Sequence, residues 1–414
     1  MGGAKRQWME EQERGWSDPD TSVCDECVTE VYLAALVRDG ASEHTCDYCG
    51  RTSETSDSPI ACPTWVVVEA VADTIGYFYS DPQDANVPYD EGEYALAPTD
   101  TADVLAGFPT VGSDVFHEAL VECFNDRSWV PTAKGDWASS HKSDELEYSW
   151  SAFTEKVKHS TRYHFAYLAS DDREELSSAE TLEALGEMVT TLGLVRELGA
   201  GTSIYRVRVK RARDSWEPNA ATMGAPPAGN ASAGRMNPPG ISYFYAALQA
   251  ETAFAEVCTA PPLEVVAATF ALKESVSVID FCDLPERPSV FDPDRRDAYQ
   301  KHTFLTRFVH AISRPVRKDG GEHVSYVPTQ VVCEWFAQVF TDAAGQRLAG
   351  LVFPSAVLPG GKNVVFFPSE RSYAPSFTML EFESGDQESI EDWADFVARL
   401  GCTPDRRLRR GLLG

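Results

Sequence analysis

The chain has 414 residues and a formal net charge of −28, because 64 acidic side chains outnumber 36 lysines and arginines. Such a charge argues against a general nucleic-acid binder and against binding to anionic membranes, since both need clustered basic side chains. Hydrophobic residues make up 43% of the chain, which is enough for two or three buried cores. No uncharged apolar run approaches the roughly 18 residues of a membrane span, and the first residues lack a signal-peptide core. We therefore expect a cytoplasmic protein.

Four of the ten cysteines form two pairs with CxxC spacing. Cys24 and Cys27 make the first pair, and Cys46 and Cys49 make the second. Two such pairs about 15–20 residues apart are typical of a tetrahedral Zn²⁺ site with four thiolate ligands. Gly50 follows the second pair and can supply the left-handed residue that such a turn needs. Four protein ligands leave no open position for a substrate, so we expect the zinc to be structural.

The N-terminal half is predicted to contain three parts. Residues 1–22 are a polar segment, and residues 23–60 form a zinc knuckle with a short helix or hairpin at Thr29–Arg38. Residues 61–195 show mainly helical periodicity. The clearest predicted helices are Trp65–Phe78, Asp114–Asn125 and Ser177–Leu194, the last with an N-cap near Ser178. The acidic, turn-rich stretch Asp81–Thr101 predicts a surface loop.

The C-terminal half changes character after Gly199–Gly201. Residues 196–385 mix apolar strands with helices and a long Gly/Pro-rich loop, which predicts a mixed α+β domain. The expected helices are Ala250–Cys258, Phe304–Ile312 and Pro328–Phe340. The expected strands include Ile204–Val209, an aromatic strand that ends at Tyr245, and residues 265–272, 276–281, 348–354 and 363–368. Residues 386–414 predict an acidic helix, Ser389–Leu400, followed by a basic tail.

Five polar residues of this half stand where a fold does not need them. Arg206 lies inside a strand, and Arg235 follows a Gly-rich loop that permits close approach to a ligand. Tyr245 ends an aromatic strand, Glu256 lies on an apolar helix, and Ser355 follows a strand. Two arginines, a tyrosine, a carboxylate and a hydroxyl are what a dinucleotide diphosphate and its ribose require. The sequence therefore predicts a binding site for an anionic dinucleotide.

The order and spacing of these motifs resemble those of the RES-domain family. The resemblance covers residues 200–370. It rests on Tyr205-Arg206, the loop from Gly234 to Gly240, the strand at Tyr245, Glu251–Glu256, Phe353-Pro-Ser355, and the blocks at 278–291 and 323–336. It implies a fold similar to that of the ADP-ribosyltransferase toxins and NAD⁺ as substrate. Members of the family destroy NAD⁺ by glycohydrolysis or phosphorolysis, or transfer its ADP-ribose to a protein, and many are toxins paired with an antitoxin.

The resemblance also implies roles for the five residues. Arg206 and Arg235 would bind the diphosphate, Tyr245 would pack on or hydrogen-bond the nicotinamide side, and Ser355 would orient the nicotinamide ribose. Glu256 would be the catalytic carboxylate, although Glu251 belongs to the same motif. The two glutamates are five residues apart and point in different directions on a helix. We prefer Glu256, because Glu251 falls at the expected helix N-terminus. The loop carries Met236 where the family usually has Trp, and methionine keeps the packing but not the indole N–H.

The N-terminal half resembles the zinc-containing, helical, HEPN-like domain of long RES proteins. HEPN ribonucleases use an Arg-x(4–6)-His pair, and three segments match that spacing: Arg38–His44, Arg296–His302 and Arg317–His323. None lies in the helical region, so we interpret all three as chance. The hypothesis for this domain is that it gates the NAD⁺ site or forms a homo-oligomer, without ribonuclease activity.

Three functional hypotheses follow. The first is an NAD⁺-degrading toxin or defence effector that cleaves the nicotinamide–ribose bond. The second is a protein ADP-ribosyltransferase that uses NAD⁺. The third is a HEPN-type protein that binds or cleaves RNA, which the net charge and the misplaced Arg/His pairs disfavour. The expected partners are NAD⁺ and an antitoxin or regulatory protein, with no membrane.

Overall fold

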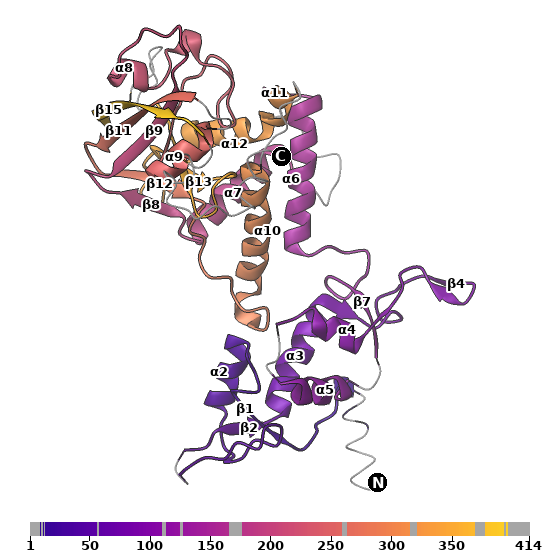
Figure 1. Cartoon of the computed structure of the whole chain (residues 1–414). Helices are drawn as coiled ribbons and strands as arrows, with labels where there is room; N and C mark the ends of the chain where they lie inside the picture. Colours follow the sequence, from indigo (N-terminus) through magenta and orange to yellow (C-terminus); the bar gives the residue numbers. More distant parts are fainter. Residues whose placement is uncertain are drawn as a thin grey trace. The chain divides into compact units, whose positions relative to one another are not determined.

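The computed structural model describes residues 9, 11, 13–55, 58–109, 113–124, 127–164, 176–258, 263–314, 321–368, 377–392 and 395. The chain divides into two compact units (Figure 1). Unit 1 is Met1–Glu145 with Arg287–Thr303, and unit 2 is Leu146–Glu286 with Phe304–Gly414. Helices α6 (Lys142–His159) and α10 (Arg296–Ser313) each contribute to both units. These units are defined by contacts, so the domain limits near residues 60, 195 and 385 stay predictions.

Unit 1 is built of short helices and small sheets around one apolar core. Its helices are α2 (Val31–Asp39), α3 (Trp65–Phe78), α4 (Thr101–Ala106) and α5 (Asp114–Glu122). Its strands are β1 (Ser22–Cys24) with β2 (Ala61–Pro63), β3 (Tyr79–Ser80) with β7 (Ser128–Pro131) and β6 (Thr99–Asp100), and the hairpin β4 (Tyr89–Asp90) with β5 (Glu93–Tyr94). The core joins Leu33, Val68, Ile75 and Phe116 to three of the paired cysteines.

The predicted helices of this half are present with adjusted ends. The helix Trp65–Phe78 has the predicted limits, and the segment between the cysteine pairs is a helix rather than a hairpin. The stretch predicted to be helical also contains the short strands listed above, because brief pairings leave little periodicity in the sequence. Three of them, β4, β5 and β6, lie inside the predicted loop Asp81–Thr101.

Unit 2 is organised around one eight-stranded mixed sheet. The strand order is β15-β11-β9-β10-β14-β13-β12-β8, and among these only β12 and β13 pair in parallel. The strands are β8 (Val195–Leu198), β9 (Ser203–Val209), β10 (Phe244–Ala247), β11 (Leu263–Leu272), β12 (Val276–Asp280), β13 (Gly350–Pro354), β14 (Lys362–Phe366) and β15 (Leu380–Ile390). The described helices of this unit besides α6 and α10 are α7 (Ser178–Thr191), α8 (Ala220–Met223), α9 (Ala250–Val257), α11 (Glu322–Ser325) and α12 (Val327–Gln338).

The two faces of this sheet pack against different partners. On one face Leu351 and Val365 join a core with side chains of α6, α7, α10 and α12. Their strand neighbours Val352 and Val364 point to the opposite face and join a second core with Phe244 and Phe270. Helix α9 packs over β9 in a third cluster. Helix α7 starts with a capping box in which Ser177, one residue before the predicted position, is the N-cap and Glu180 is its partner.

The predicted helix Ser389–Leu400 is wrong at its start. Ser389 and Ile390 end strand β15, where Ile390 pairs with Leu263 of β11. A long cross-strand ladder outweighs the local helical preference of an acidic segment. Residues 393, 394 and 396–414, which include the predicted basic tail, lie outside the described residues.

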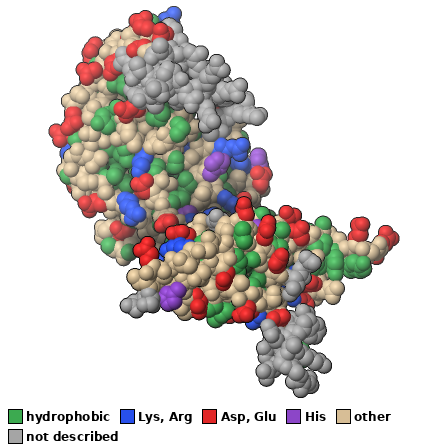
Figure 2. Space-filling view, turned by 60° about the horizontal axis from the view of Figure 1, so that its bottom comes forward, with side chains coloured by type: hydrophobic (Ala, Val, Ile, Leu, Met, Phe, Trp, Pro, Cys, Tyr) green, Lys and Arg blue, Asp and Glu red, His purple; other side chains and the backbone are tan. Residues whose placement is uncertain are grey.

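Acidic side chains are spread over the surface that Figure 2 draws, in keeping with the net charge. Among the described helices, none combines the length and the apolar composition that crossing a bilayer requires.

Candidate active site and candidate metal centre

The predicted site residues surround one cavity at a break in the sheet of unit 2. Strands β9 and β10 share only one paired position, Tyr205 with Ala247, although both continue past it. A cavity of about 390 Å³ opens there. Its lining includes Arg206, Arg208, Arg235, Tyr245, Ala253, Glu256, Tyr326, Phe353 and Asn363. Four of the five predicted residues thus line one cavity, and the fifth, Ser355, contacts Glu256.

Arg206 brings an uncompensated positive charge to this cavity. Within the described part of the chain, its buried Nη1 atom has no hydrogen-bond partner. Its guanidinium lies 4.9 Å from the centre of the Phe244 ring. Burial, together with the nearby Arg208, lowers the pKa of Arg206 to about 10, so the side chain remains a cation at neutral pH. Arg206 as a whole is half-buried, but buried N–H groups of a cation without a partner are costly, and an anionic ligand would remove that cost.

The guanidinium group of Arg235 is fixed by hydrogen bonds to two backbone carbonyl oxygens. Its Nη1 donates to the carbonyl oxygens of Ile312 and Arg314, each at 2.7 Å, where α10 ends. Its guanidinium carbon lies 5.9 Å from the centre of the Tyr326 ring. Burial lowers the pKa of Arg235, while Tyr326 and Glu256 oppose the shift. One guanidinium nitrogen is therefore occupied, and Arg235 has its other N–H groups to offer a ligand.

The hydroxyl of Tyr245 supports the loop that carries Arg235. It donates to Oδ1 of Asn237 at 2.7 Å and accepts from the backbone N–H of Met236 at 2.9 Å. A Cβ on Gly234 would lie 2.8 Å from this hydroxyl, so the close approach requires glycine. Met236 itself is buried in the core of unit 2, which keeps the packing expected of the usual tryptophan. Tyr245 thus presents its ring to the cavity while its hydroxyl fixes the loop.

Glu256 and Ser355 form a direct pair. The Ser355 hydroxyl donates to Oε1 of Glu256 at 2.7 Å and accepts the backbone N–H groups of Val357 at 3.2 Å and Leu358 at 3.1 Å. Glu251 lies in the first turn of α9 and does not line this cavity. The structure thus brings Glu256, and not Glu251, together with the other predicted residues.

The lining residues Asn363 and Tyr326 contact predicted site residues, although the sequence-based prediction gave them no role. Asn363 begins the apolar run of β14, and its Nδ2 donates to Oε1 of Glu256 at 2.6 Å. Tyr326 precedes α12 and lies beside Arg235. An isolated asparagine in an apolar strand was the one available signal, since a buried amide needs a partner. The spacing of the sequence could not identify that partner.

The four paired cysteines converge as a candidate metal centre. Their Sγ atoms all lie within 4.8 Å of one another. Three Sγ–Sγ distances are 3.9 Å for Cys24–Cys27, 3.6 Å for Cys24–Cys49 and 3.8 Å for Cys27–Cys46. Tetrahedral coordination with metal–sulfur bonds of about 2.3 Å places sulfurs about 3.8 Å apart. The spacing therefore fits a four-thiolate metal ion.

The surroundings of the cysteines act on their thiolate forms in both directions, and burial raises the pKa of Cys24 and of Cys27. Burial opposes the thiolate form of Cys46, but backbone N–H groups of Cys49, Tyr48 and Cys24 outweigh it and lower its pKa to about 7. Gly50 has the predicted left-handed conformation, with φ of +72°. Arg51 follows the second pair and forms ion pairs with Asp25 at 3.3 Å and Glu26 at 2.9 Å inside the first. These ion pairs join the two turns beside the sulfurs.

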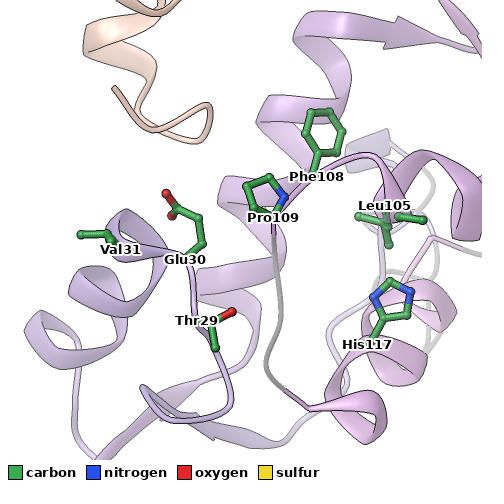
Figure 3. A pocket seen from close by; sticks show the side chains of 8 residues that line it. Thr29, Glu30, Val31, Leu105, Phe108, Pro109 and His117 are labelled. Atoms are coloured by element: carbon green, nitrogen blue, oxygen red, sulfur yellow. The ribbon is translucent and has the colours of Figure 1, made fainter. Parts of the chain in front are cut away.

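A separate cavity in unit 1 has different chemistry. It measures about 490 Å³ and is lined by Thr29, Glu30, Val31, Leu105, Ala106, Phe108, Pro109 and His117 (Figure 3). The carboxylate of Glu30 already caps α2 by accepting the Leu33 N–H at 2.9 Å. Neither lysine nor arginine lines this cavity, so it lacks the cations that a dinucleotide diphosphate needs.

The Arg/His pairs considered for RNA cleavage have structural surroundings of their own. Arg38 lies 3.4 Å from Asp25 beside the cysteine cluster. Arg296 lies 2.6 Å from Asp73, and His302 is buried in α10. Arg317 lies outside the described residues. Arg296 and His302 lie in the part of α10 that groups with unit 1, and Arg296 contacts α3 there, so the expectation that this pair belongs to the C-terminal domain is wrong.

Comparison with known families gives two matches. The model of HEPN/RES N-terminal domain 1 matches residues 39–171, and the model of the RES domain matches residues 203–379. No curated protein and no solved structure matches the chain. The candidate active site lies within the second match. Cys24 and Cys27 lie ahead of the first match, and Cys46 and Cys49 lie within it.

Proposed function

The chain belongs to the long-form RES-domain proteins, and on this premise we propose that it cleaves the nicotinamide–ribose bond of NAD⁺. RES domains are generally NAD⁺-processing and toxin-like. For this chain we propose the more specific role of an NAD⁺-degrading toxin or defence effector. The observation that carries the proposal is one cavity that combines the uncompensated cation of Arg206 with the carboxylate of Glu256.

In this proposal the arginines bind the diphosphate. Arg206 supplies the buried N–H groups that lack a partner, and Arg235 supplies those not donated to the end of α10. Guanidinium groups grip phosphate oxygens through paired hydrogen bonds, and this fixes the adjoining ribose relative to α9. The rings of Tyr245 and Tyr326 form apolar walls for the nicotinamide end.

Glu256 acts on the ribose in the proposed reaction. The bond between C1′ of the ribose and the pyridinium nitrogen breaks, and nicotinamide leaves as a neutral molecule with the bonding electrons. The sugar then carries an oxocarbenium-like positive charge, which a nearby carboxylate stabilises. An acceptor attacks C1′ and loses a proton when the acceptor is water. Ser355 holds the carboxylate in place through its hydrogen bond to Oε1.

The products distinguish the two enzymatic hypotheses. Purified full-length protein is incubated with NAD⁺ in buffers with and without phosphate, and the products are identified by proton NMR. We expect free nicotinamide together with ADP-ribose, or with ADP-ribose 1-phosphate when phosphate is the acceptor. Adenine-labelled NAD⁺ added with cell extract tests transfer, because label on protein would indicate ADP-ribosylation instead. An unchanged NAD⁺ spectrum under all these conditions would contradict the proposal.

We further propose that the metal held by Cys24, Cys27, Cys46 and Cys49 is zinc. Four thiolates in tetrahedral spacing are the donor set of structural zinc sites. With four protein ligands the ion has no free position, so its contribution is to the fold of unit 1 rather than to catalysis.

A further inference from the structure

Asn363 occupies a buried position, where an amide side chain without hydrogen bonds would destabilise the fold. It lies on the interior strand β14, opposite Ala247 of β10 on one side and Phe353 of β13 on the other. Its side chain is 8% exposed, and the next three residues of the strand are fully buried and apolar. A buried amide without hydrogen bonds destabilises a fold, so this position requires a specific partner.

That partner is Glu256. The amide Nδ2 lies 2.6 Å from Oε1 of the carboxylate, and the Ser355 hydroxyl lies 2.7 Å from the same oxygen. A carboxylate only accepts, so the amide must turn its NH₂ toward it. The hydroxyl has two lone pairs, and two backbone N–H groups already occupy them. Its single proton is therefore directed at Glu256.

Both donors act on one oxygen of the carboxylate. Among the described residues, no hydrogen bond reaches Oε2. The two donors come from different elements, β14 and the segment after β13, so together they fix both the position and the rotation of the carboxylate. A single donor would allow the group to pivot about one hydrogen bond.

We propose that Asn363 is a positioning residue, which with Ser355 holds Glu256 so that Oε2 faces the reacting ribose. This inference rests on the proposed cleavage of NAD⁺. In this role Asn363 acts through Glu256, by setting the angle at which the carboxylate meets the developing positive charge. Misplacing such a group weakens the stabilisation of the transition state more than the binding of the substrate.

The test replaces the donor without changing its shape. In Asn363→Asp a second carboxyl group lies beside Glu256, and two carboxylates at this spacing share one proton at a raised apparent pKa. We expect kcat to fall at least about 10-fold at pH 8 with KM little changed, and to recover partly toward pH 6 as the shared proton restores a donor. Asn363→Ala should lose kcat at both pH values. The matched control is Asn219→Asp, which keeps the oxygen that caps α8, and we expect wild-type kinetics.

The outcomes separate this inference from the proposed function. Wild-type kcat and an unchanged pH profile in Asn363→Asp would overturn the positioning role while leaving NAD⁺ cleavage intact. Wild-type protein that releases no nicotinamide would overturn the proposed function. In that case a double-mutant cycle of Asn363→Ala and Glu256→Gln, measured by thermal unfolding, still tests whether the two side chains are in contact. We expect non-additive losses in Tm, and additive losses would refute the contact.

Discussion

At the scale of single residues, most polar side chains of the site have hydrogen-bond partners within the protein, and one does not. The hydroxyls of Tyr245 and Ser355 and the amide of Asn363 all have partners within the protein. Arg206 is the exception, since its buried Nη1 has none among the described residues. An unpartnered charged group of this kind is characteristic of binding sites, where the fold tolerates an uncompensated charge that the ligand neutralises.

This contrast predicts opposite effects of one substitution on stability and binding. Arg206→Met removes a cation whose buried Nη1 lacks a partner, but also its contact with Phe244. We expect unchanged stability or a gain of up to about 1 kcal/mol, together with loss of the thermal stabilisation that NAD⁺ gives the wild type. Thermal unfolding with and without NAD⁺ measures both effects. Arg196→Met, on the edge strand β8, is the control and should keep the NAD⁺ response; a strongly destabilised Arg206→Met that still responds to NAD⁺ would contradict the prediction.

The sequence predicted the residues that belong to a motif, but it did not predict the hydrogen-bond partners of those residues. Arg206, Arg235, Tyr245 and Glu256 could be placed together because their order and spacing resemble a known family, and the structure places all four around one cavity. Asn363 could not be paired with Glu256, because that contact depends on how β14 is aligned with its neighbours in the sheet. A single sequence without homologues does not contain this register.

At the scale of elements, helices with strong apolar periodicity were predictable and short strands were not. The limits of α3 followed from its pattern, because a 14-residue amphipathic helix gives many matching positions. Strands of two residues, such as β4 and β5, give almost none. Strand β15 was missed altogether, because the ladder with β11, rather than local preference, decides its conformation.

Two helical glycines test how closely the elements pack. Gly186 lies in α7, where an added Cβ would come within 2.6 Å of the Trp335 ring and 3.0 Å of the Phe340 ring. We expect Gly186→Ala to destabilise the protein by about 1–3 kcal/mol through overpacking, despite the better helix propensity of alanine. Gly76 in α3 has no atom within 4 Å of such a Cβ, so Gly76→Ala should stabilise by about 0.5–1 kcal/mol.

Chemical denaturation of both variants measures these changes. Equal stabilisation by the two substitutions would show that α7 and α12 do not pack as closely as the distances at Gly186 require.

At the scale of the whole molecule, the two compact units have separate cores and separate chemistry. The cysteine cluster belongs to the core of unit 1, and the candidate active site belongs to the sheet of unit 2. The acidic net charge is compatible with an anionic substrate, because the cavity carries three arginines and one carboxylate in its lining. The local charge, rather than the total, decides what this cavity can bind.

The separation of the two chemistries leads to a prediction about the metal. Three of the four cysteines are buried among the apolar side chains of α2, α3 and α5, so an ion bound by them would stabilise this core. We expect one zinc per chain by elemental analysis, and a lower Tm of unit 1 after chelation or in Cys46→Ser. Cys62→Ser replaces a buried cysteine outside the cluster and should retain the zinc. Metal content well below one per chain, or a Tm insensitive to chelation, would contradict the assignment.

One comparison of rates tests most directly whether Glu256 promotes cleavage of the nicotinamide–ribose bond, as proposed. Nicotinamide release from NAD⁺ is measured for the wild type, Glu256→Gln and Glu251→Gln, which change the same residue type on the same helix. Glu256→Gln should lower kcat about 100-fold or more, since it removes the charge that stabilises the oxocarbenium-like sugar, while Glu251→Gln should retain wild-type kinetics. Equal rates for Glu256→Gln and the wild type, or a loss confined to Glu251→Gln, would contradict the account.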